Sequence, residues 1–496
     1  MRKEGLKELN ALMARRGIVM PAYAPYGELA GFYDYGPIGV LIKHNIENAW
    51  RKHFIIAGRN VEMEANIVGP AQMFRASGHL ANFTDPIVTC LRCKSAHRAD
   101  KLVIEALEKE GREADAQSVP GAGTERLSAL LSELGIRCDA CGGSLGKVET
   151  FNLMMATTIG AAGGAQGFLR PETAQGIFVD FKVLFRAYSL KLPAGIGQIG
   201  RVFRNEISPR RGLLRMREFS QMELEYFFDP ADAEWGKSTK SDQQMLNTQI
   251  NVLSRDMQER NETAYKRIRL ADSIDEGIVP NALFAHLLAR ESAFIAAIGI
   301  DERDVRFRQM LKDELPHYSR GNVDLEVKID GRFEEVAGNA YRADFDLSGH
   351  QRASGESMEV LHAGRKLIPH VVEISFGTDR LFLALLSNSL YFDEARGWEV
   401  LALNEAVAPY KYSVFPLQKD EALMEVAERL CERLSAAGIP VNFSASGSIG
   451  KRYARSDEIG VGTAVTVDYQ TLEEGTVTLR EMRDTKQRRV RMEDVG

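Results

Sequence analysis

The stretch Gln198–Phe228, QIGRVFRNEISPRRGLLRMREFSQMELEYFF, decides the fold of this chain. It contains two segments of alternating character on either side of a turn with proline and glycine, and this pattern predicts a β-hairpin. Successive side chains of a strand point to opposite faces of the sheet. One face of the second segment is therefore apolar, with Met222, Leu224, Tyr226 and Phe228. The opposite face carries Phe219, Gln221, Glu223 and Glu225.

The turn of this hairpin is rich in arginine. Six arginines share seventeen residues with a single acid, Glu206, and they are Arg201, Arg204, Arg210, Arg211, Arg215 and Arg217. A face that combines guanidinium groups, carboxylates and an aromatic ring suits a triphosphate, a purine and a small cation. A solvated strand face with ordinary ion pairs would have the same composition. The hairpin alone therefore leaves both interpretations open.

The composition is that of a globular enzyme with more than one domain. The chain has 496 residues, enough for about three domains, and its hydrophobic content of 44% and charged content of 27% are ordinary. The apolar run LFLALL is far too short to cross a membrane. The N-terminus has no apolar core and carries Glu4 and Glu8, so it resembles neither a secretory signal nor a transit peptide. We therefore expect a cytoplasmic protein without a membrane partner.

Positive charge is local rather than global. The formal net charge is −6, but the segment from Arg480 to Arg491 contains six Lys or Arg residues and only two acids. Lys451, Arg452 and Arg455 form a second cluster. Such clusters occur on solvated surfaces as well as at nucleic-acid contacts. The charge pattern is compatible with a nucleic-acid partner but does not require one.

Four of the five cysteines form two pairs, Cys90–Cys93 and Cys138–Cys141. Paired C-x-x-C segments followed by glycine are typical of zinc ribbons, because both thiolates of a pair can reach one ion. We expect a structural Zn²⁺ in an insertion at about 88–150. The 44 residues between the pairs exceed the usual spacing and are expected to loop out. A ribbon that has lost its ion is the alternative.

A second arginine site is predicted near residue 380. Val371–Gly377 alternates, with Glu373, Ser375 and Gly377 on one face, and it runs directly into an apolar helix. Thr378 or Asp379 is the expected N-cap, and Arg380 falls in the first turn. A helix N-terminus with an arginine binds anions well. An arginine that only pairs with an acid near a cap is the alternative.

The remaining patterns define the domain organisation. Apolar spacing predicts an amphipathic helix over 40–54, followed by a strand that ends at Pro70. Residues 167–228 are expected to be rich in strands, and 230–322 to form a second, mainly helical insertion. From 405 to 496 the pattern is strand, helix, strand, loop, helix, strand and hairpin, which indicates a separate α/β domain. The first 404 residues would form the other, larger domain.

Three of these elements resemble the signature motifs of class II aminoacyl-tRNA synthetases: Pro70 after its helix, the arginine hairpin, and the turn with Gly377 and Arg380. The sequence is most similar to the homodimeric, archaeal and eukaryotic glycyl-tRNA synthetases. The segments that carry the resemblance are ASGHLANFTDP (76–86), RADKL (98–102), LRPETAQGIFVDF (169–181), QIGRVFRNEISPR (198–210), MREFSQMELEYF (216–227), RADFDL (342–347), EISFGTDR (373–380), APYKYSVFPL (408–417) and GSIGKRYARSDEIG (447–460).

The resemblance implies an α+β fold with a six-stranded antiparallel sheet flanked by helices, followed by an α/β anticodon-binding domain. It implies a glycine–tRNA ligase, which activates glycine with ATP to glycyl-adenylate and then passes glycine to the 3′ end of tRNA(Gly). ATP and Mg²⁺ would be required. The chain would act as a homodimer, because Pro70 and the preceding helix build the dimer interface in this family.

The resemblance also assigns residues to ATP. Arg204 would hold the α-phosphate and the glycine carboxylate, Arg380 the γ-phosphate, and Phe219 would stack on adenine while Glu206 accepts from its amine. Arg204, Glu206 and Arg380 are the implied catalytic residues. Glu335 and a neighbouring acid are candidates for magnesium. The implied ATP-binding set is Arg204, Asn205, Glu206, Leu214, Arg215, Met216, Arg217, Glu218, Phe219, Glu335, Val336, Gly377, Thr378, Asp379 and Arg380.

Glycine has to be selected by excluding every larger amino acid. Three glutamates supply an acidic wall for its ammonium, and Ser375 would lie where a side chain would project. The implied glycine-binding set is Arg98, Glu172, Phe219, Ser220, Gln221, Met222, Glu223, Glu373, Ile374, Ser375, Phe376 and Gly377. Glu172 could instead cap a helix. His79 is expected to order the first motif's loop rather than to transfer protons.

Two observations limit the resemblance. Asp379 stands where many class II chains have a small residue, and an acid there is unexpected beside a γ-phosphate unless it caps the helix or meets magnesium. Prolyl, threonyl or histidyl ligases share the C-terminal fold, and non-enzymatic relatives bind nucleic acid or serve polymerases. The RPETAQG segment disfavours the former, and the retained Arg204, Glu206, Phe219 and Arg380 disfavour the latter. The tRNA bases read, the role of 230–322 and side products such as diadenosine tetraphosphate stay open.

Overall fold

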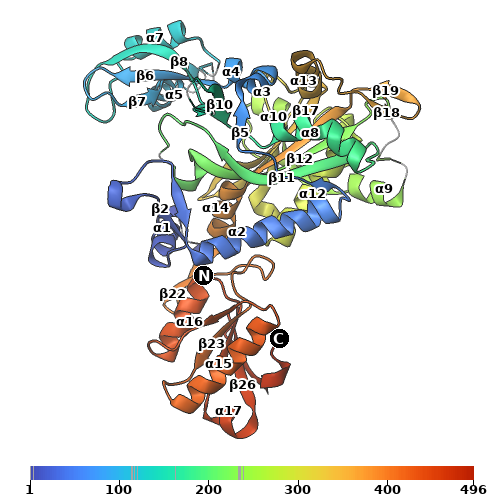
Figure 1. Cartoon of the computed structure of the whole chain (residues 1–496). Coiled ribbons are helices and arrows are strands. Elements are labelled where there is room, and N and C mark those ends of the chain that lie inside the picture. Colours follow the sequence, from blue (N-terminus) through green and yellow to red (C-terminus); the bar gives the residue numbers. More distant parts are fainter. Residues whose placement is uncertain are drawn as a thin grey trace.

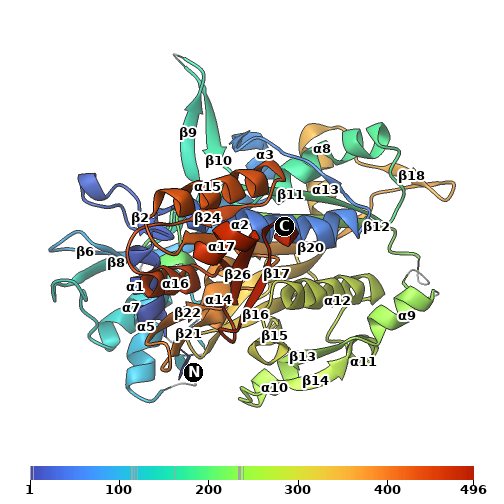
Figure 2. The same cartoon turned by 90° about the horizontal axis from the view of Figure 1, so that it is seen from below.

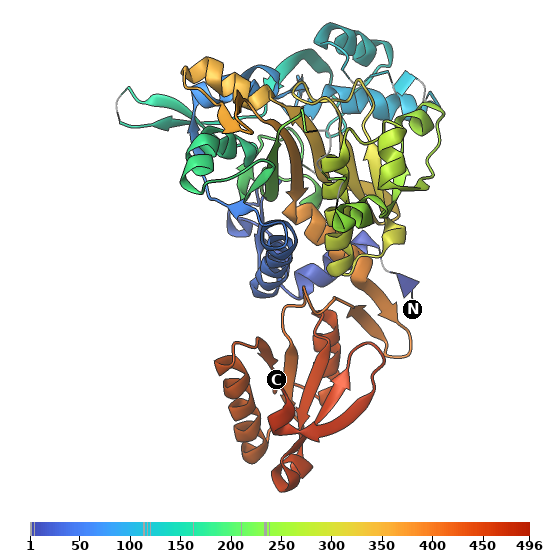
Figure 3. The same cartoon turned by 90° about the vertical axis from the view of Figure 1, so that its right-hand side faces the viewer.

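The protein is represented by a computed structural model that describes residues 2–3, 5–112, 115–116, 118–119, 121–161, 163–209, 211–232, 236–237 and 239–496. Arg210, one of the six arginines of the hairpin, lies outside the described residues. The chain forms a large body around one central sheet, with a smaller body below it (Figure 1). The smaller body is the C-terminal α/β domain expected from the sequence, and Figure 3 shows it from the side.

The central sheet has nine strands in the order β14-β13-β15-β16-β17-β20-β12-β11-β4. Six of them, from β16 to β4, match the expected six-stranded sheet, although β4 pairs with β11 in parallel. The other three come from the segment 230–322. The strands are β4 (Val61–Glu62), β11 (Ala194–Phe203), β12 (Glu218–Phe228), β13 (Gln249–Leu253), β14 (Lys266–Arg269), β15 (Val305–Gln309), β16 (Val323–Ile329), β17 (Arg332–Ala343) and β20 (His370–Gly377).

The segment 230–322 is therefore joined to the sheet rather than appended to it. Its helices are α9 (Lys240–Leu246), α10 (Arg255–Glu259), α11 (Leu270–Asp275) and α12 (Ala282–Ala297). Helix outweighs strand in its described residues, but β15 pairs with the edge of β16 and thereby satisfies its backbone groups. Val252 and Phe307 are fully or almost fully buried in the main core. The segment, expected to be a mainly helical insertion, thus also extends the central sheet by three strands.

The region 167–228, expected to be rich in strands, contains the end of β10 (Ala165–Leu169), β11 and β12, but residues 174–187 form helix α8 (Ala174–Ala187) between β10 and β11. Ala174, Ile177, Phe178 and Phe181 are buried at helical spacing. The ring of Phe181 stacks on that of Phe227 with centroids 4.2 Å apart. Helix α8 therefore covers the polar face of β12 at its C-terminal end.

The hairpin has the two faces that its alternation predicts. β11 and β12 pair antiparallel, with Gln198 opposite Glu223. Met222 and Leu224 are buried in the main core on the side where α14 (Thr378–Ser389) packs against β12, and α2 (Pro37–Trp50) packs against α14. The helix expected over 40–54 is confirmed as α2, continued by a π-helical turn over Arg51–Ile56. Helices α2, α12 and α14 cover the apolar face of the sheet, which leaves the opposite face for the site (Figure 1).

The cysteine-bearing insertion is a small folded unit. Its sheet contains β6 (Thr84–Cys90), β7 (Ala96–Arg98) and β8 (Leu145–Asn152), and its helices include α5 (Ala99–Lys109) and α7 (Thr124–Glu133). Val103, Leu107 and Leu127 are buried with Val88 and Val148 in a core of their own. The 44 residues between the cysteine pairs thus do not simply loop out, because their amphipathic helices bury apolar faces on the sheet.

Short elements complete the large body. They are β1 (Arg2–Lys3), α1 (Leu6–Arg15), β2 (Val19–Pro21), β3 (Tyr33–Tyr35), β5 (Val68–Pro70), α3 (Ala71–Ala76), α4 (His79–Asn82), β9 (Met155–Ile159), α13 (Phe345–Ser354), β18 (Val360–His362), β19 (Arg365–Leu367), β21 (Leu390–Asp393) and β22 (Trp398–Leu401). The β9–β10 hairpin projects from the body beside α3 (Figure 2).

The C-terminal domain has a five-stranded sheet in the order β24-β23-β25-β26-β27. Its elements are β23 (Tyr412–Pro416), α15 (Glu421–Ala436), β24 (Val441–Phe443), α16 (Ile449–Glu458), β25 (Thr463–Val467), α17 (Tyr469–Glu474), β26 (Thr476–Glu481) and β27 (Gln487–Arg491). The predicted order is confirmed, with α17 in addition. Asp457 joins the two bodies, because its carboxylate accepts from Arg396 and Trp398 of the large body, each at 3.1 Å.

None of the helices in the described parts of the chain combines the length and apolar composition that a membrane span requires.

Candidate active site

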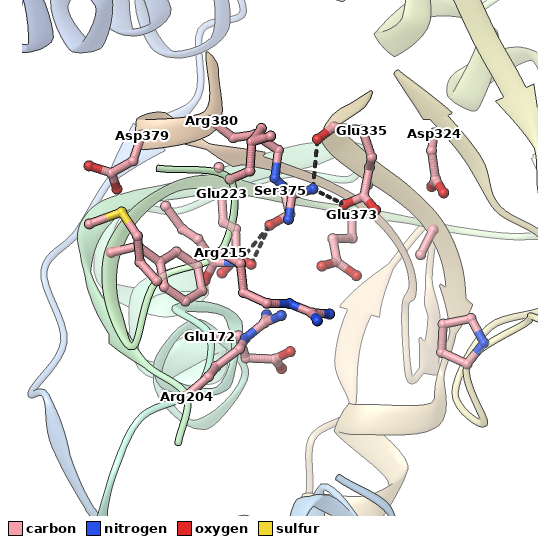
Figure 4. A pocket seen from close by; sticks show the side chains of 18 of the residues that line it. Glu172, Arg204, Arg215, Glu223, Asp324, Glu335, Glu373, Ser375, Asp379 and Arg380 are labelled. Carbon is pink, nitrogen blue, oxygen red and sulfur yellow. Dashed lines mark hydrogen bonds and ion pairs between the residues drawn. The ribbon is translucent and has the colours of Figure 1, made fainter. Parts of the chain in front are cut away.

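A cavity of about 290 Å³ opens on the polar face of the sheet, between β12, β17, β20 and the turn that follows β11. Figure 4 shows the side chains of Glu172, Arg204, Glu223 and Glu373 directed toward a common space. The predicted site residues that line it are Glu172, Arg204, Glu206, Leu214, Arg215, Met216, Phe219, Gln221, Glu223, Glu335, Glu373, Ser375, Gly377, Asp379 and Arg380. Segments more than 200 residues apart in sequence therefore meet at one site.

Arg204 is held in place by its neighbours. Its Nε donates to the carbonyl of Pro171 at 3.1 Å. The guanidinium carbon lies 5.2 Å from the ring centroid of Phe219 and 5.4 Å from that of Phe83, within the range of cation–π attraction. Because these contacts leave the outer nitrogens toward the cavity, the arginine is oriented before any anion arrives.

Arg380 lies in the first turn of α14, at the rim of the same cavity. Its Nη1 donates to the Glu335 carbonyl at 2.6 Å and lies 3.3 Å from the Glu335 carboxylate. The N-cap of α14 is Gly377, and no side chain caps the helix. The expected cap by Thr378 or Asp379 is therefore wrong, because β20 runs straight into the helix. The free N–H groups of the first turn add to the positive field of the arginine.

The floor of the cavity is acidic. Glu223 is 1% exposed, and its carboxylate accepts from Ser375 Oγ at 2.6 Å and from Thr173 Oγ1. Glu172 lies 3.4 Å from His79 Nε2 and accepts from Gln175 at 2.8 Å. Glu172 therefore lies in the cavity instead of capping α8, and its carboxylate is held by His79 and Gln175.

A buried arginine that the sequence analysis did not assign organises these acids. Arg342 is 1% exposed and donates to both oxygens of Asp346, at 2.7 and 2.9 Å, and to Glu373 at 2.7 Å. It also lies 3.5 Å from Glu172. Its guanidinium carbon is 3.9 Å from the ring centroid of Tyr318. The RADFDL segment carries this pair, since Arg342 and Asp346 are four residues apart.

Several buried carboxylates surround the guanidinium of Arg342, and burial and neighbouring charges shift their pKa values. Burial raises the pKa of Glu223, of Glu225 and, to about 8, of Glu373, with neighbouring carboxylates adding to the effect. Burial would also raise the pKa of Glu172, but His79 and Arg342 together lower it below its ordinary value. Glu373 therefore retains a proton at neutral pH in the free enzyme, and the crowded carboxylates of the floor are suited to receive a small cation.

A second acidic pair lies under Arg380. Asp324 and Glu335 both line the cavity, and burial, followed by the charge of Glu335, raises the pKa of Asp324 well above its usual range. Asp324 Oδ1 is buried without a hydrogen-bond partner among the described residues. Unpaired carboxylate oxygens of this kind are the ligands that Mg²⁺ prefers. The residues present therefore fit a divalent cation.

Four predicted residues lie on the wrong face. Val336, Met222, Ile374 and Phe376 are buried in the main core, because side chains alternate along β12, β17 and β20. Only their backbone could contribute to the cavity. The same alternation directs Ser220 away from it, where the hydroxyl accepts from Lys43 at 2.6 Å.

Other predicted residues lie beside the cavity rather than in it. Arg217 donates to the carbonyls of Glu206 and Ala30, and Arg98 pairs with Asp85 at 2.7 Å and with Asp100. Glu218 lies 3.6 Å from Arg201. Asn205 and Thr378 do not line the cavity either. Arg98 lines an adjoining cavity of about 510 Å³ that shares Leu214, Arg215, Glu335 and Arg380 with the first.

A third group of residues lines the cavity without having been predicted from the sequence. These residues are Leu213, Met310, Pro316, Tyr318, Asn322, Asp324, Gly338 and Ala340. Asp324 could have been found, because it lies at the start of the alternating strand β16, directly after Val323. The loop that carries Met310, Pro316 and Tyr318 gives no periodic signal.

The four paired cysteines meet at one point. Their ligand atoms all lie within 4.8 Å of one another, with Cys90 Sγ 3.6 Å from Cys141 Sγ and Cys93 Sγ 3.6 Å from Cys138 Sγ. These distances are far longer than a disulfide and close to the roughly 3.8 Å expected between thiolates around a tetrahedral metal ion. A Cβ on Gly143 would lie 3.0 Å from Cys90 Sγ, so glycine keeps the cluster open. The cluster can hold a metal ion.

Comparisons with known proteins agree with this geometry. Residues 162–389 match the family described as tRNA synthetase class II core domain (G, H, P, S and T), and residues 411–496 match the anticodon binding domain. The chain is 37% identical to the glycine–tRNA ligase of Aeropyrum pernix, with 100% of this chain and 96% of that protein covered. It is 35% identical to the enzyme named likewise from Methanothrix thermoacetophila, with 97% and 94% covered.

A solved structure shares the fold. Giardia lamblia prolyl-tRNA synthetase, in complex with prolyl-adenylate, superposes with a TM-score of 0.59 at 13% identity, over 100% of this chain and 76% of that one. At this identity the similarity concerns architecture alone.

Proposed function

The chain belongs to the glycine–tRNA ligase family of class II aminoacyl-tRNA synthetases, and on that premise we propose how its residues divide the reaction. The enzyme joins glycine to tRNA at the expense of ATP. The observation that carries the assignment of roles is the single cavity in which Arg204 and Arg380 face Glu172, Glu223 and Glu373.

Arg204 and Arg380 bind the polyphosphate. The glycine carboxylate attacks the α-phosphorus, a new P–O bond forms, and the bond to pyrophosphate breaks with the electron pair leaving on pyrophosphate. Negative charge accumulates on the phosphoryl oxygens, and a guanidinium that is already oriented stabilises it without reorganisation. Arg204, fixed by Pro171 and Phe219, contacts the α-phosphate and the glycine carboxylate, and Arg380 contacts the γ-phosphate. Phe219 stacks on adenine, and Glu206 accepts from its amine.

Asp324 and Glu335 are the residues that would hold Mg²⁺ beside Arg380. When bound, the ion would supply positive charge to the polyphosphate. Support comes from the unpaired Oδ1 of Asp324 and from the mutual repulsion of the two carboxylates, which a cation would relieve. Glu335 was predicted from the sequence as one magnesium ligand, and we assign Asp324 as the neighbouring acid.

Glu223 and Glu373 receive the ammonium of glycine, with Glu172 behind them. Ser375 is bonded to Glu223 and occupies the direction in which a larger side chain would project. Any other amino acid would have to displace Ser375 or Tyr318 from a packed wall, so selection works by exclusion.

Glycine binding should become tighter as pH rises from about 6.5 to about 8. Glu373 retains its proton in the free enzyme up to a pKa of about 8, and the arriving ammonium favours the carboxylate, so binding releases a proton. The KM for glycine should therefore fall over this range while the KM for ATP changes little. Pyrophosphate exchange measured at several pH values checks this. Glu373→Gln should flatten the profile, and a glycine KM that rises with pH would contradict the assignment.

The C-terminal domain reads the anticodon. Lys451 and Arg455 of the second basic cluster lie in helix α16, and the basic residues 483–491 follow on the same domain. A tRNA(Gly) transcript with either the second or the third anticodon C exchanged should lose about tenfold or more in kcat/KM for glycylation. Pyrophosphate exchange, which needs no tRNA, should be unchanged. Equal glycylation of the exchanged and normal transcripts would exclude anticodon reading.

The cysteine cluster binds one structural Zn²⁺. The purified protein should contain about one zinc per chain by elemental analysis, since four thiolates close a tetrahedral site. Cys93→Ser together with Cys138→Ser should lose the metal and lower the melting temperature. Cys431→Ser removes the cysteine outside the cluster and should keep the metal. Protein purified without metal that shows full stability would rule the site out as a zinc site.

Two further assignments follow from the family. The chain forms a homodimer through α2 and the segment that ends at Pro70, and exposed apolar residues such as Val68 and Val183 are compatible with a buried surface on this body. It works in the cytoplasm. Light scattering that gives a stable, active monomer would contradict the first assignment.

A further inference from the structure

Asp379 is the acid that departs from the class II pattern, and its contacts explain its presence. It is 2% exposed, and its carboxylate points away from Arg380 and Glu335 (Figure 4). Oδ1 accepts from the Tyr35 hydroxyl at 2.5 Å, and Oδ2 accepts from the backbone N–H of Ser220 at 2.6 Å. Asp379 therefore neither caps α14 nor faces the magnesium candidates.

Lys43 of α2 balances the charge of this acid. Its Nζ donates to Ser220 Oγ at 2.6 Å, lies 3.9 Å from Asp379 Oδ1, and lies 5.0 Å from the ring centroid of Tyr35. Lys43 is 7% exposed. Charge-assisted hydrogen bonds between buried partners are the strongest of their kind. The four residues form one closed network among β3, α2, β12 and α14.

The network begins where the sheet ends. β12 and β20 pair as far as Gln221 and Gly377, and beyond that pair β20 turns into α14. The N–H of Ser220 thus loses the carbonyl that a continuing strand would offer. The Asp379 carboxylate takes the place of that carbonyl and ties the end of β12 to the first turn of α14.

The residues next to the hydrogen bond between Ser220 and Asp379 are those assigned to ATP. Ser220 follows Phe219, which faces adenine, and Asp379 precedes Arg380, which faces the γ-phosphate. We propose that Asp379, Lys43 and Tyr35 are positioning residues that fix the distance between the adenine-stacking ring and the γ-phosphate arginine. This inference rests on the ATP roles proposed above. It gives α2, the helix assigned to the dimer interface, a direct connection to ATP binding.

The test uses Asp379→Asn in the full-length enzyme. An amide keeps the shape but offers one acceptor and one donor, so it cannot accept from both Tyr35 and Ser220. We expect the KM for ATP in pyrophosphate exchange to rise by about tenfold or more, and the KM for glycine to stay within about twofold. Lys43→Met should act in the same direction. The double variant should be no worse than the more damaged single variant, because both changes break one network.

Tyr35→Phe is the milder variant, since it removes one hydroxyl and leaves the ring against Phe382. It should raise the KM for ATP by a smaller factor, and it keeps the test valid if Asp379→Asn fails to fold. Glu394→Gln, an exposed acid beyond the end of α14, is the matched control and should behave as wild type. A lower melting temperature with unchanged KM for ATP, or equal rises in both KM values, would overturn the inference. Wild-type enzyme without glycine-dependent exchange would instead overturn the proposed roles themselves.

Discussion

Replacing Arg204 with alanine should lower the kcat of glycyl-adenylate formation by about a thousandfold, because arginines that stabilise a transferring phosphoryl group contribute effects of this size. The guanidinium is oriented by Pro171 and by the rings of Phe219 and Phe83, so its charge needs no rearrangement as the α-phosphate reacts. ATP–pyrophosphate exchange with glycine measures the effect. Arg204→Lys should recover part of the rate, since an ammonium keeps the charge but not the planar fork.

Arg211→Ala is the matched control for this experiment. Arg211 belongs to the same arginine-rich turn, but its side chain is 55% exposed, pairs with Glu334 and does not line the cavity. Its loss should leave exchange within about twofold, as expected for an exposed ion pair. If Arg204→Ala retained more than a tenth of the wild-type rate, the α-phosphate would have to be stabilised by another group.

Replacing Glu223 with glutamine should raise the KM for glycine by about a hundredfold and leave the KM for ATP within about threefold. The carboxylate is 1% exposed and is held by Ser375 and Thr173, so the bound ammonium would lose a buried, oriented charge partner. Exchange kinetics with glycine and ATP varied separately measure the two constants. Equal losses for both substrates would show that Glu223 does not select the amino acid.

The melting temperature of the Glu223→Gln variant provides a second test of this role. Burial, followed by the charge of Glu172, raises the pKa of Glu223, so burying its ionised form costs stability in the free enzyme. The neutral amide should therefore keep or raise the melting temperature while activity falls. A large drop in melting temperature would mean that Glu223 serves the fold rather than glycine. Glu356→Gln, at an exposed position, provides the baseline.

The faces of the arginine hairpin could be predicted because alternation along a strand is a local property. Glu223 and Met222 lie on opposite faces of β12, as the pattern indicates. The same rule, applied to β17 and β20, would have excluded Val336, Ile374 and Phe376 from the site. Those residues entered through the family resemblance, which marks positions in a segment and not the direction of each side chain.

The centre of the acidic floor could not be predicted, because it depends on how distant segments meet. Arg342 comes from β17, Glu172 precedes α8, and Glu373 lies on β20, and no local pattern places one guanidinium among these acids. Helix α8 was missed for a related reason. Its apolar spacing is helical, but it lies between two strands in a region that alternates on both sides.

The strands at one edge of the sheet could not be predicted for the same reason. β13 and β15 are short strands separated by about fifty residues of mostly helical sequence, so the nine-stranded sheet appears only after the fold has formed. The cysteine pairs, by contrast, were predictable as a cluster, since a C-x-x-C segment places both of its thiols locally. Their convergence across 44 residues required β6 and β8 to pair.

The central claim is that one cavity presents arginines to a polyphosphate and carboxylates to the smallest amino acid. ATP–pyrophosphate exchange measured with each of the twenty amino acids tests it most directly. We predict rapid exchange with glycine and at least about a hundredfold lower kcat/KM with alanine, whose methyl group meets Ser375. Exchange supported equally by alanine, proline, threonine or histidine, or by no amino acid at all, would contradict this account.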